Sequence, residues 1–511
     1  MADDPYLPPA ALLLRGLGIT VDDLAQPRAL VSGPFLRHLI SALAAAAPFD
    51  AGHYAAANPD VAAAVKAGRI ASLHHHFVTQ GYFEGRTPCA HGAAGHAAAA
   101  AAWERAAAMA AGQFRSGLHV RLHARSVEQA WVQAFRPPLV APPPLGFRGG
   151  PVLTDSAEDR RLRHTRYGQP VDSFDVTAAI GMALDVEATY AGPAYHHFGH
   201  ILSEMVHRII PGRRMFGCDR WLLVGTIGER PLTGFAELPQ VQQDILHFLE
   251  LPPERVHVAH QDMRVRTLHV VEAGSDFGFG PKPGYLRDLR AFSLPRLDRL
   301  HGDEPGFPRI YVSRSGIAHG GNFLGERYLE RLLEDEGYAV VQPERLPFTR
   351  QMDLYRKAEL VLFPEGSACH GVELLGEGMM GRCVLLVRRE NHRHIFERVL
   401  APRAASFAAF SGAIPLGTIV AHPVDGSPLD HLGVALFDLE ALQEFLRAEG
   451  LARLPTLDRR RYFEAAAADL AGYVRHHGDA GSALLPGAVA ALHEGFSREA
   501  QKQLRMSAGA G

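Results

Sequence analysis

The clearest pattern of hydrophobic and polar positions lies between residues 309 and 376. A short β-branched and aromatic run, Ile310-Tyr311-Val312, predicts a strand. Apolar residues then recur at helical spacing over 328–333, and Gly337 ends that helix. The pattern continues with a strand over 338–341, a helix opened by Pro347 and Thr349, and a strand over 360–363 that runs into a further helix. This β-α-β-α-β-α order predicts a parallel sheet with helices on both faces.

A second α/β pattern precedes this one. Short apolar runs predict strands over 183–186, 221–224, 255–260 and 267–272, with helices after Gly192 and around 241–249, and a strand over 383–388 continues the later sheet. The two patterns predict an α/β protein with two doubly wound, Rossmann-like domains, over residues 151–300 and 301–440.

The segments outside these domains are predicted to be helical or extended. Residues 1–136 are expected to form an N-terminal helical module and connector, 137–150 a proline-rich linker, and 441–511 a set of C-terminal helices. In the module, Asn58-Pro59-Asp60 indicates a helix start, because Pro suits the first helical position. The triplet His74-His75-His76 is not expected to bind a metal, because consecutive helical side chains point about 100° apart.

Composition limits the classes of function. The 511 residues are 47% hydrophobic and 21% charged, with a formal net charge of −3, so global charge does not favour a nucleic-acid partner. The four cysteines form no CxxC pair, which favours a reducing compartment and argues against structural zinc. No basic signal segment and no run of about 18 apolar residues is present, so a cytoplasmic location is expected.

Two strand ends in the later domain carry residues suited to a phosphate. Ser313-Arg314 ends one strand, and Gly366-Ser367-Ala368 follows another. Ligands of such sheets bind at the carboxyl ends of the strands. Small residues before a helix present free N–H groups, and an arginine offers a planar, permanently charged fork. A nucleotide half-site is one interpretation. An ordinary strand-to-helix loop with a surface arginine is the other.

In the earlier domain, His200 and Glu204 lie four residues apart on a predicted helix. They therefore share a face, and a carboxylate held against an imidazole raises its basicity, as a general base requires. A solvated His–Glu pair is the alternative. A zinc site of His196, His200 and Glu204 is disfavoured, because the order of these residues is not HExxH.

Over roughly residues 190–390 the chain resembles glycosyltransferase family 61, in its bacterial branch. The segments that carry the resemblance are Phe198–Glu204, Tyr311–Arg314, Gly325-Glu326, Phe348–Ala358 and Glu365–Ala368. Two positions depart from the family pattern. Gly325 stands where Asn is usual, and Glu365 replaces the loop His, so Glu365 is expected to point away from a diphosphate or to touch sugar or ribose hydroxyls. Residues 48–88 (NPDV…EGR) resemble a small module of bacterial surface-polysaccharide enzymes and large secreted repeat proteins.

The resemblance implies a glycosyltransferase-B arrangement, with the acceptor side in 151–300 and the donor side in 301–440. It implies inverting, metal-independent transfer of a sugar from a UDP-sugar, with no other cofactor, to a hydroxyl of a surface glycan or glycoconjugate. His200, oriented by Glu204, would be the base. The donor would be held by Ser313, Arg314, Gly366, Ser367, Ala368, His370 near the diphosphate and Glu373 near the ribose; Asn391, His392 and His394 are expected nearby.

The expected partners are a nucleotide-sugar donor and a glycan, lipid-linked or protein acceptor, without nucleic acid. Peripheral association with the inner face of the membrane stays open as an alternative to a purely cytoplasmic protein. The competing hypothesis is a non-catalytic nucleotide- or glycan-binding or scaffold protein of a polysaccharide assembly, kept open by the departures at Gly325 and Glu365. A hydrolase is disfavoured, since neither a GxSxG elbow nor a P-loop is present.

Overall fold

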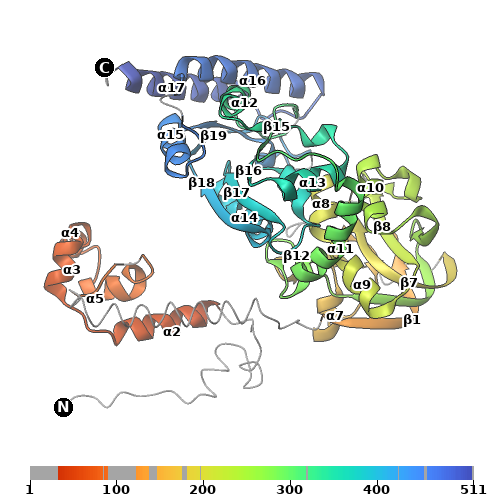
Figure 1. Ribbon diagram of the computed structural model, residues 1–511. Coiled ribbons are helices and arrows are strands. Elements are labelled where there is room, and N and C mark those ends of the chain that lie inside the picture. Colours follow the sequence, from red (N-terminus) through yellow and green to blue (C-terminus); the bar gives the residue numbers. More distant parts are fainter. Residues whose placement is uncertain are drawn as a thin grey trace, which may run out of the picture. The chain divides into compact units, whose positions relative to one another are not determined.

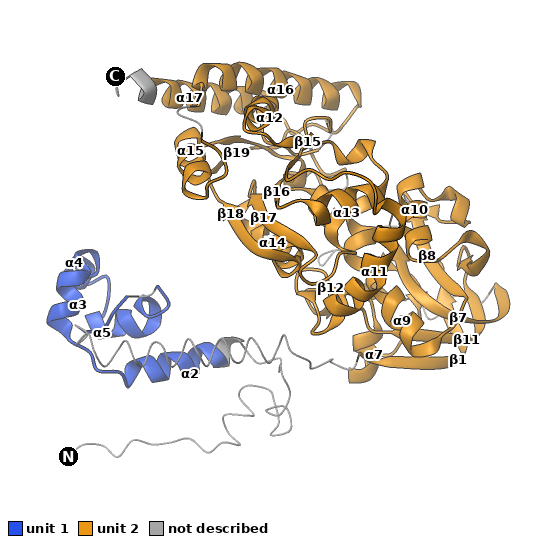
Figure 2. Ribbon diagram, viewed as in Figure 1, with its two compact units in different colours: residues 1–118 blue, residues 119–511 orange. Residues whose placement is uncertain are grey.

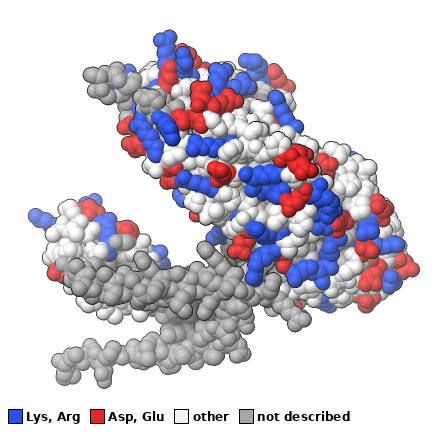
Figure 3. Space-filling view, in the orientation of Figure 1, with Lys and Arg blue, Asp and Glu red and all other residues white. Residues whose placement is uncertain are grey.

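A computed structural model gives the structure of the chain. It describes residues 33–84, 86–89, 122–136, 147–174, 181–195, 197–228, 230–317, 320–423, 425–453 and 457–508. The chain divides into two compact units, residues 1–118 and 119–511 (Figure 2). Basic and acidic side chains are intermingled over the faces seen in Figure 3. Among the described residues, no helix combines the length and the apolar character needed to cross a membrane.

The described part of the first unit is a cluster of short helices. They are α2 (Gly33–Ala45), α3 (Ala51–Ala57), α4 (Pro59–Lys66), α5 (Leu73–His76) and a π-turn, η2 (Phe77–Gly81). Helix α4 begins at Pro59, as the sequence predicts. Tyr54, Val61 and Phe77 lie in the buried core of this helix cluster, and the Tyr54 hydroxyl contacts His76 Nδ1 at 3.0 Å. The last histidine of the triplet is therefore a hydrogen-bonded core residue.

The second unit contains two large sheets, of which the first is mixed, beside several two-stranded ones (Figure 1). Four parallel strands lie in the order β10-β8-β7-β11: β10 (Val256–Val258), β8 (Trp221–Ile227), β7 (Met182–Ala194) and β11 (Met263–Val271). Beyond β11 the sheet continues with β1 (Ala124–Gln133), which is antiparallel to β11, and with β3 (Gly150–Pro151), which is antiparallel to β1. The first sheet thus begins before the proline-rich segment 137–150, and the boundary between the compact units falls at 118/119.

The second sheet is wholly parallel, with strand order β15-β14-β16-β17-β18. Its strands are β14 (Arg309–Val312), β15 (Ala339–Val341), β16 (Leu360–Pro364), β17 (Met380–Leu386) and β18 (Ala404–Phe410). The strands predicted over 310–312, 338–341, 360–363 and 383–388 are confirmed to within a few residues. Because the chain leaves β14 toward one edge and later returns beside it as β16, the ends of these two strands form the topological switch point where such sheets bind ligands.

Alternate residues of the second sheet pack on opposite faces, as the two-residue period of a strand requires. Ile310 and Val312 join a core with α13 (Phe348–Lys357) and α14 (Arg393–Leu400), which continues into α9 (Ile209–Phe216), α10 (Gln240–Phe248) and α11 (Tyr285–His301) of the first half. Tyr311 faces a second core with α12 (Glu326–Asp335), α15 (Leu439–Ala448), α16 (Arg459–Asp479) and α17 (Ala488–Ala508). One continuous core therefore joins the two halves, and the C-terminal helices cover the outer face of the second sheet.

The shorter elements connect these layers. They are β2 (Phe147–Arg148), α7 (Ala157–Leu162), β4 (Thr165–Arg166), β5 (Gln169–Pro170), β6 (Asp172–Ser173), α8 (Phe198–His200), the π-turn η3 (Ile201–Met205), η4 (Val206–Arg208), β9 (Arg230–Pro231), η5 (Phe235–Glu237), η6 (Pro253–Arg255), β12 (Ser275–Asp276), β13 (Gly280–Pro281), η7 (Pro343–Arg345), η8 (Ser367–Val372), η9 (Glu390–His392), η10 (Ala401–Arg403), β19 (Ala413–Gly417), η11 (Asp430–Leu432) and β20 (Val434–Phe437). The protein is a mixed α/β protein, as the sequence predicts.

Candidate active site

The His200–Glu204 pair lies where β7 leads into a distorted helix. Helix α8 passes directly into the π-turn η3, a distortion often found at functional sites. His200 Nδ1 and Glu204 Oε1 are 2.5 Å apart, which confirms the contact expected from their spacing. His196, the third member of the disfavoured zinc set, lies outside the described residues. Among those described, no group of three His, Cys, Asp or Glu residues is arranged to hold a metal ion.

Glu204 is the buried centre of this group. Arg166 binds it through both carboxylate oxygens, at 2.9 and 3.1 Å, and His164 Nε2 lies 2.8 Å from Oε2. Burial works to raise the pKa of Glu204, but His200, His164 and Arg166 together hold it well below its usual range. The carboxylate is therefore ionised and accepts a hydrogen bond from Nδ1–H of His200. This leaves Nε2 as the basic nitrogen of the ring, which is 36% exposed.

Histidines from both halves surround His197. Burial, followed by the charges of His200, His370 and His431, lowers the pKa of His197 to about 4. His370 comes from η8, after β16 in the second sheet, and a Cβ added to Gly199 would lie 3.2 Å from its ring. Helix α8 of the first half and the segment after β16 of the second half are therefore in contact.

Glu373 lies inside the protein. Its carboxylate accepts a hydrogen bond from Arg403 at 3.0 Å and contacts His370 Nδ1 at 3.1 Å, while His207 Nε2 is 3.5 Å away. Although burial acts in the opposite direction, Arg403 and the two histidines hold the pKa of Glu373 well below its usual range. Glu373 thus fixes His370 and the junction between the halves.

Arg314 occupies the switch point at the end of β14. It is 6% exposed; its Nε donates to Asn322 at 3.2 Å, while its buried Nη1 has no hydrogen-bond partner among the residues that the structure describes. The guanidinium lies directly against Gly366, so that a Cβ at this position would overlap it. Neighbouring Ser313 is fully buried and donates to Glu330. The structure therefore brings Arg314 and Gly366 together and uses Ser313 as support.

The segment after β16 differs from the helix that the sequence predicts. Residues Ser367–Val372 form a 3₁₀ helix of six residues, in which Ala368 and His370 are buried. So short a helix has little dipole, because the dipole grows with the number of aligned peptide units. Positive charge at this end of the sheet therefore comes from side chains.

Glu365 organises two further arginines. Its Oε2 accepts from the backbone N–H groups of Arg388 at 2.8 Å and Arg389 at 2.6 Å, and its Oε1 accepts from Arg389 Nε at 2.7 Å. Burial, then the charge of Arg389, lowers the pKa of Arg388 to about 9. With Arg314, which lies against the next residue, Gly366, these residues place three arginines at the ends of β14 and β17, beside the loop after β16.

His431 connects the arginines with the histidines. Its backbone carbonyl accepts from Arg388 Nη2 at 3.2 Å. Burial, then the charges of Arg389, Arg388 and, less strongly, His200, lowers the pKa of His431. His431 is therefore close enough to interact electrostatically with both the two arginines and His200.

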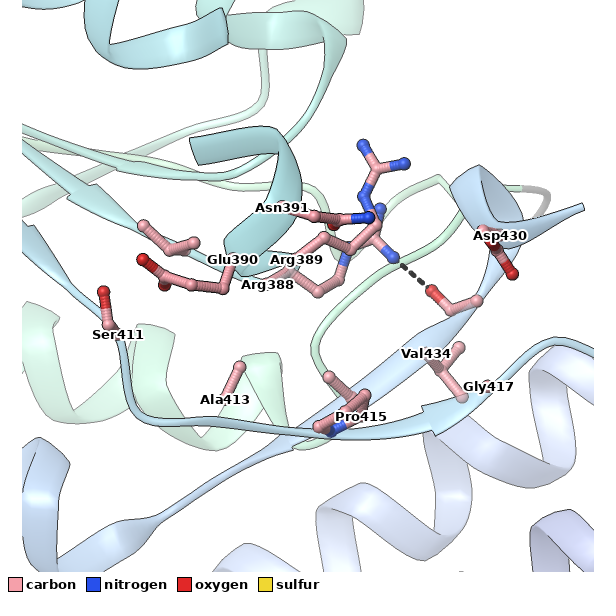
Figure 4. A pocket seen from close by; sticks show the side chains of 13 residues that line it. Arg388, Arg389, Glu390, Asn391, Ser411, Ala413, Pro415, Gly417, Asp430 and Val434 are labelled. Carbon is pink, nitrogen blue, oxygen red and sulfur yellow. Dashed lines mark hydrogen bonds between the residues drawn. The ribbon is translucent and has the colours of Figure 1, made fainter. Parts of the chain in front are cut away.

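A cavity of about 360 Å³ opens beside the arginines (Figure 4). Arg388, Arg389, Glu390 and Asn391 form one wall, and small residues of β19 and β20, including Ala413 and Pro415, form the other. Arg388 is fixed there by a hydrogen bond from Nη1 to the Gly433 carbonyl. Asn391, expected near the donor site from the sequence, lines this cavity.

Comparison with known families agrees with this geometry. Residues 198–379 match the family model for glycosyltransferase 61. The matched segment contains His200, Glu204, Arg314 and the loop at Gly366, and it supports a glycosyltransferase. No curated protein matches the chain.

Several residues of the candidate site lie outside the segment that matches glycosyltransferase 61. They are His164, Arg166, Arg388, Arg389 and His431. The sequence analysis did not find them. A signal existed for the two arginines, because they stand at the carboxyl end of the strand predicted over 383–388, as Ser313-Arg314 does for an earlier strand. No local pattern marks His164, Arg166 or His431.

Proposed function

We propose that the protein transfers a sugar, with inversion and without a divalent metal, from a UDP-sugar to an acceptor hydroxyl. One observation carries the proposal. A histidine held by an ionised carboxylate lies in one half, and an arginine cluster at a topological switch point lies in the other, joined through His197, His370 and His431. A base on one side and fixed positive charge on the other are what this reaction requires. We assign the two halves to a glycosyltransferase-B arrangement.

His200 is the general base of the proposed reaction. Its Nε2 takes the proton of the acceptor hydroxyl while that oxygen bonds to the anomeric carbon, from the face opposite the leaving group. The bond from the anomeric carbon to the diphosphate oxygen breaks, and its electron pair leaves with the diphosphate. Glu204 keeps the imidazole oriented and stabilises the imidazolium, because this carboxylate is ionised. Inversion follows from the single displacement.

The arginines receive the leaving diphosphate. Arg314 offers a buried Nη1 that no other described residue hydrogen-bonds, and Arg388 and Arg389 add charge that Glu365 offsets only in part. Fixed donors of this kind stabilise developing negative charge without reorganisation. The cavity beside Arg389 is suited to the nucleoside. The acceptor is proposed to be a surface glycan or glycoconjugate, modified in the cytoplasm or at the inner face of the membrane.

The non-catalytic alternative depended on Gly325 and Glu365, and both have structural roles. The amide N–H of Gly325 donates to Asp469 at 2.9 Å and a Cβ at this position would overlap the Tyr462 ring, while Glu365 holds Arg388 and Arg389. Neither departure weakens the proposed reaction.

Calorimetric titration with UDP in the presence of EDTA tests the donor half. The wild-type chain should bind UDP, and Arg314→Ala should bind it about tenfold to hundredfold more weakly, because a hydrogen bond to a charged group contributes about 1.5–3 kcal/mol. Arg331→Ala, which removes an exposed arginine of α12, is the matched control and should bind normally. His200→Ala should bind UDP normally and lose turnover. Absence of UDP binding, or equal binding by Arg314→Ala and the wild type, would overturn the proposal.

A further inference from the structure

Two exposed aromatic rings lie beside the candidate active site. Tyr167 is in the turn between β4 and β5 and is 44% exposed; Phe279 is in the turn between β12 and β13 and is 48% exposed. The two turns meet, because the backbone N–H of Tyr167 donates to the Phe277 carbonyl at 2.9 Å. Residues more than a hundred positions apart in sequence thus present two rings at one place.

The rings are fixed by reciprocal packing on glycines. Gly278 leaves room for the Tyr167 ring and Gly168 leaves room for the Phe279 ring; a Cβ at either glycine would overlap the opposite ring. Tyr167 itself has a φ of 51°, a conformation that a bulky residue rarely adopts. Such conformations persist only where the surroundings enforce them, and they concentrate at functional sites. The two rings are therefore held rigidly before any ligand binds.

The same turns are directly connected with the catalytic pair. Arg166, the residue before Tyr167, binds Glu204, and the Phe277 ring centroid lies 6.2 Å from that of His200. Polar groups border the rings: the His394 ring centroid is 6.2 Å from that of Tyr167, and the Arg398 guanidinium is 5.6 Å from that of Phe279. Helix α14, which carries both residues, packs against β13.

We propose that Tyr167 and Phe279 form the acceptor platform and bind a pyranose ring of a glycan acceptor; this rests on the proposed function of the neighbouring site. One face of a pyranose carries C–H groups with partial positive charge, which match the negative face of an aromatic ring. The sugar hydroxyls lie at the rim of that face, where His394 and Arg398 can hydrogen-bond them. A rigid pair of separate rings with polar neighbours suits a sugar better than a flexible acyl chain.

The test uses the labelled full-length chain on an array of immobilised mono- and oligosaccharides, with saturating UDP. The wild type should bind pyranose-containing glycans. The double variant Tyr167→Ala/Phe279→Ala should lose about tenfold or more of this binding, because both stacking surfaces are removed. The double variant Tyr167→Phe/Phe279→Tyr retains both rings and should keep most of it.

Phe307→Ala is the control, because Phe307 is also 44% exposed but lies in the loop before β14. Equal loss in this variant, or full binding by the double alanine variant, overturns the platform. A wild-type chain that binds UDP but no glycan overturns it too and leaves the proposed function standing. Glycan binding without UDP binding would support the platform and overturn the proposed function. Binding to phosphatidylcholine vesicles that the alanine substitutions abolish would assign the surface to lipid and overturn the proposal.

Discussion

Glu326 gives the sharpest test of the electrostatics around Arg314. It opens α12 and is fully buried; its Oε1 accepts from the Tyr311 hydroxyl at 2.9 Å and from the Arg314 backbone N–H at 2.7 Å. Burial, the largest effect, raises the pKa of Glu326 to about 7. Replacing Glu326 by Gln keeps an acceptor oxygen for both donors and removes the charge.

The pH dependence follows from the direction of this change. Between the ordinary value of 4.5 and about 7, the folded protein keeps the proton and the unfolded chain releases it. The free energy of unfolding therefore falls as the pH rises through this interval and is level again above it. Over this interval the free energy of unfolding falls by about 3 kcal/mol, because each pKa unit corresponds to 1.36 kcal/mol. Glu326→Gln lacks this loss, so it should be more stable than the wild type by about 3 kcal/mol near pH 8 and nearly equal near pH 4.5.

Urea denaturation of both proteins across this pH range measures the difference directly. Glu334→Gln, at an exposed position of the same helix, removes one negative charge without a buried carboxylate and serves as the control. It should show the wild-type pH dependence. Parallel stability curves for Glu326→Gln and the wild type would refute the reasoning, because they would mean that Glu326 titrates alike in the folded and unfolded chain.

Three further substitutions test individual contacts. Gly366→Ala places a methyl group on the Arg314 guanidinium and should raise the UDP dissociation constant measured by calorimetry by about tenfold or more; unchanged affinity would contradict the contact. Gly325→Asn restores the residue usual in the family, but its Cβ overlaps the Tyr462 ring, so the urea free energy of unfolding should fall by about 1–3 kcal/mol. A gain in stability would argue against this packing. Glu204→Gln should reduce turnover about 10²-fold, measured as UDP release from UDP-sugars, with UDP affinity nearly unchanged. Parallel loss of UDP affinity would instead place Glu204 at the donor.

The second sheet was predictable because its pattern is local and strong. The runs at 310–312 and 360–363 are short, apolar and bounded by turn residues, and each became a buried strand. Two features were not predictable in this way. Strand β1 carries a mixed burial pattern and pairs with β11 more than a hundred residues later. Residues 367–372 form a tight 3₁₀ helix, in a segment that packs against α13 and α14.

The same distinction holds for the candidate site. The contact between His200 and Glu204 was predictable, because a spacing of four residues places both on one helical face. His164 and His431 reach the site only through tertiary structure, and neither has a sequence pattern of its own. The position of Glu373 was misleading for a related reason. Its place two turns after the loop suggested the ribose, whereas Arg403, distant in sequence, draws its carboxylate into the junction between the halves.

The two departures from the family pattern show why a motif is better judged by contacts than by letters. At 365 a carboxylate can accept three hydrogen bonds from Arg388 and Arg389, which lie beyond the segment that matches the family. A histidine there could accept at most one, so the arginines would lose the support that aims them at the cavity. At 325, glycine is required by a φ of 81° together with the close approach of Tyr462, from a C-terminal helix outside the match. Each unusual residue is thus paired with a partner distant in sequence, and its role is understood from the pair rather than from the single position.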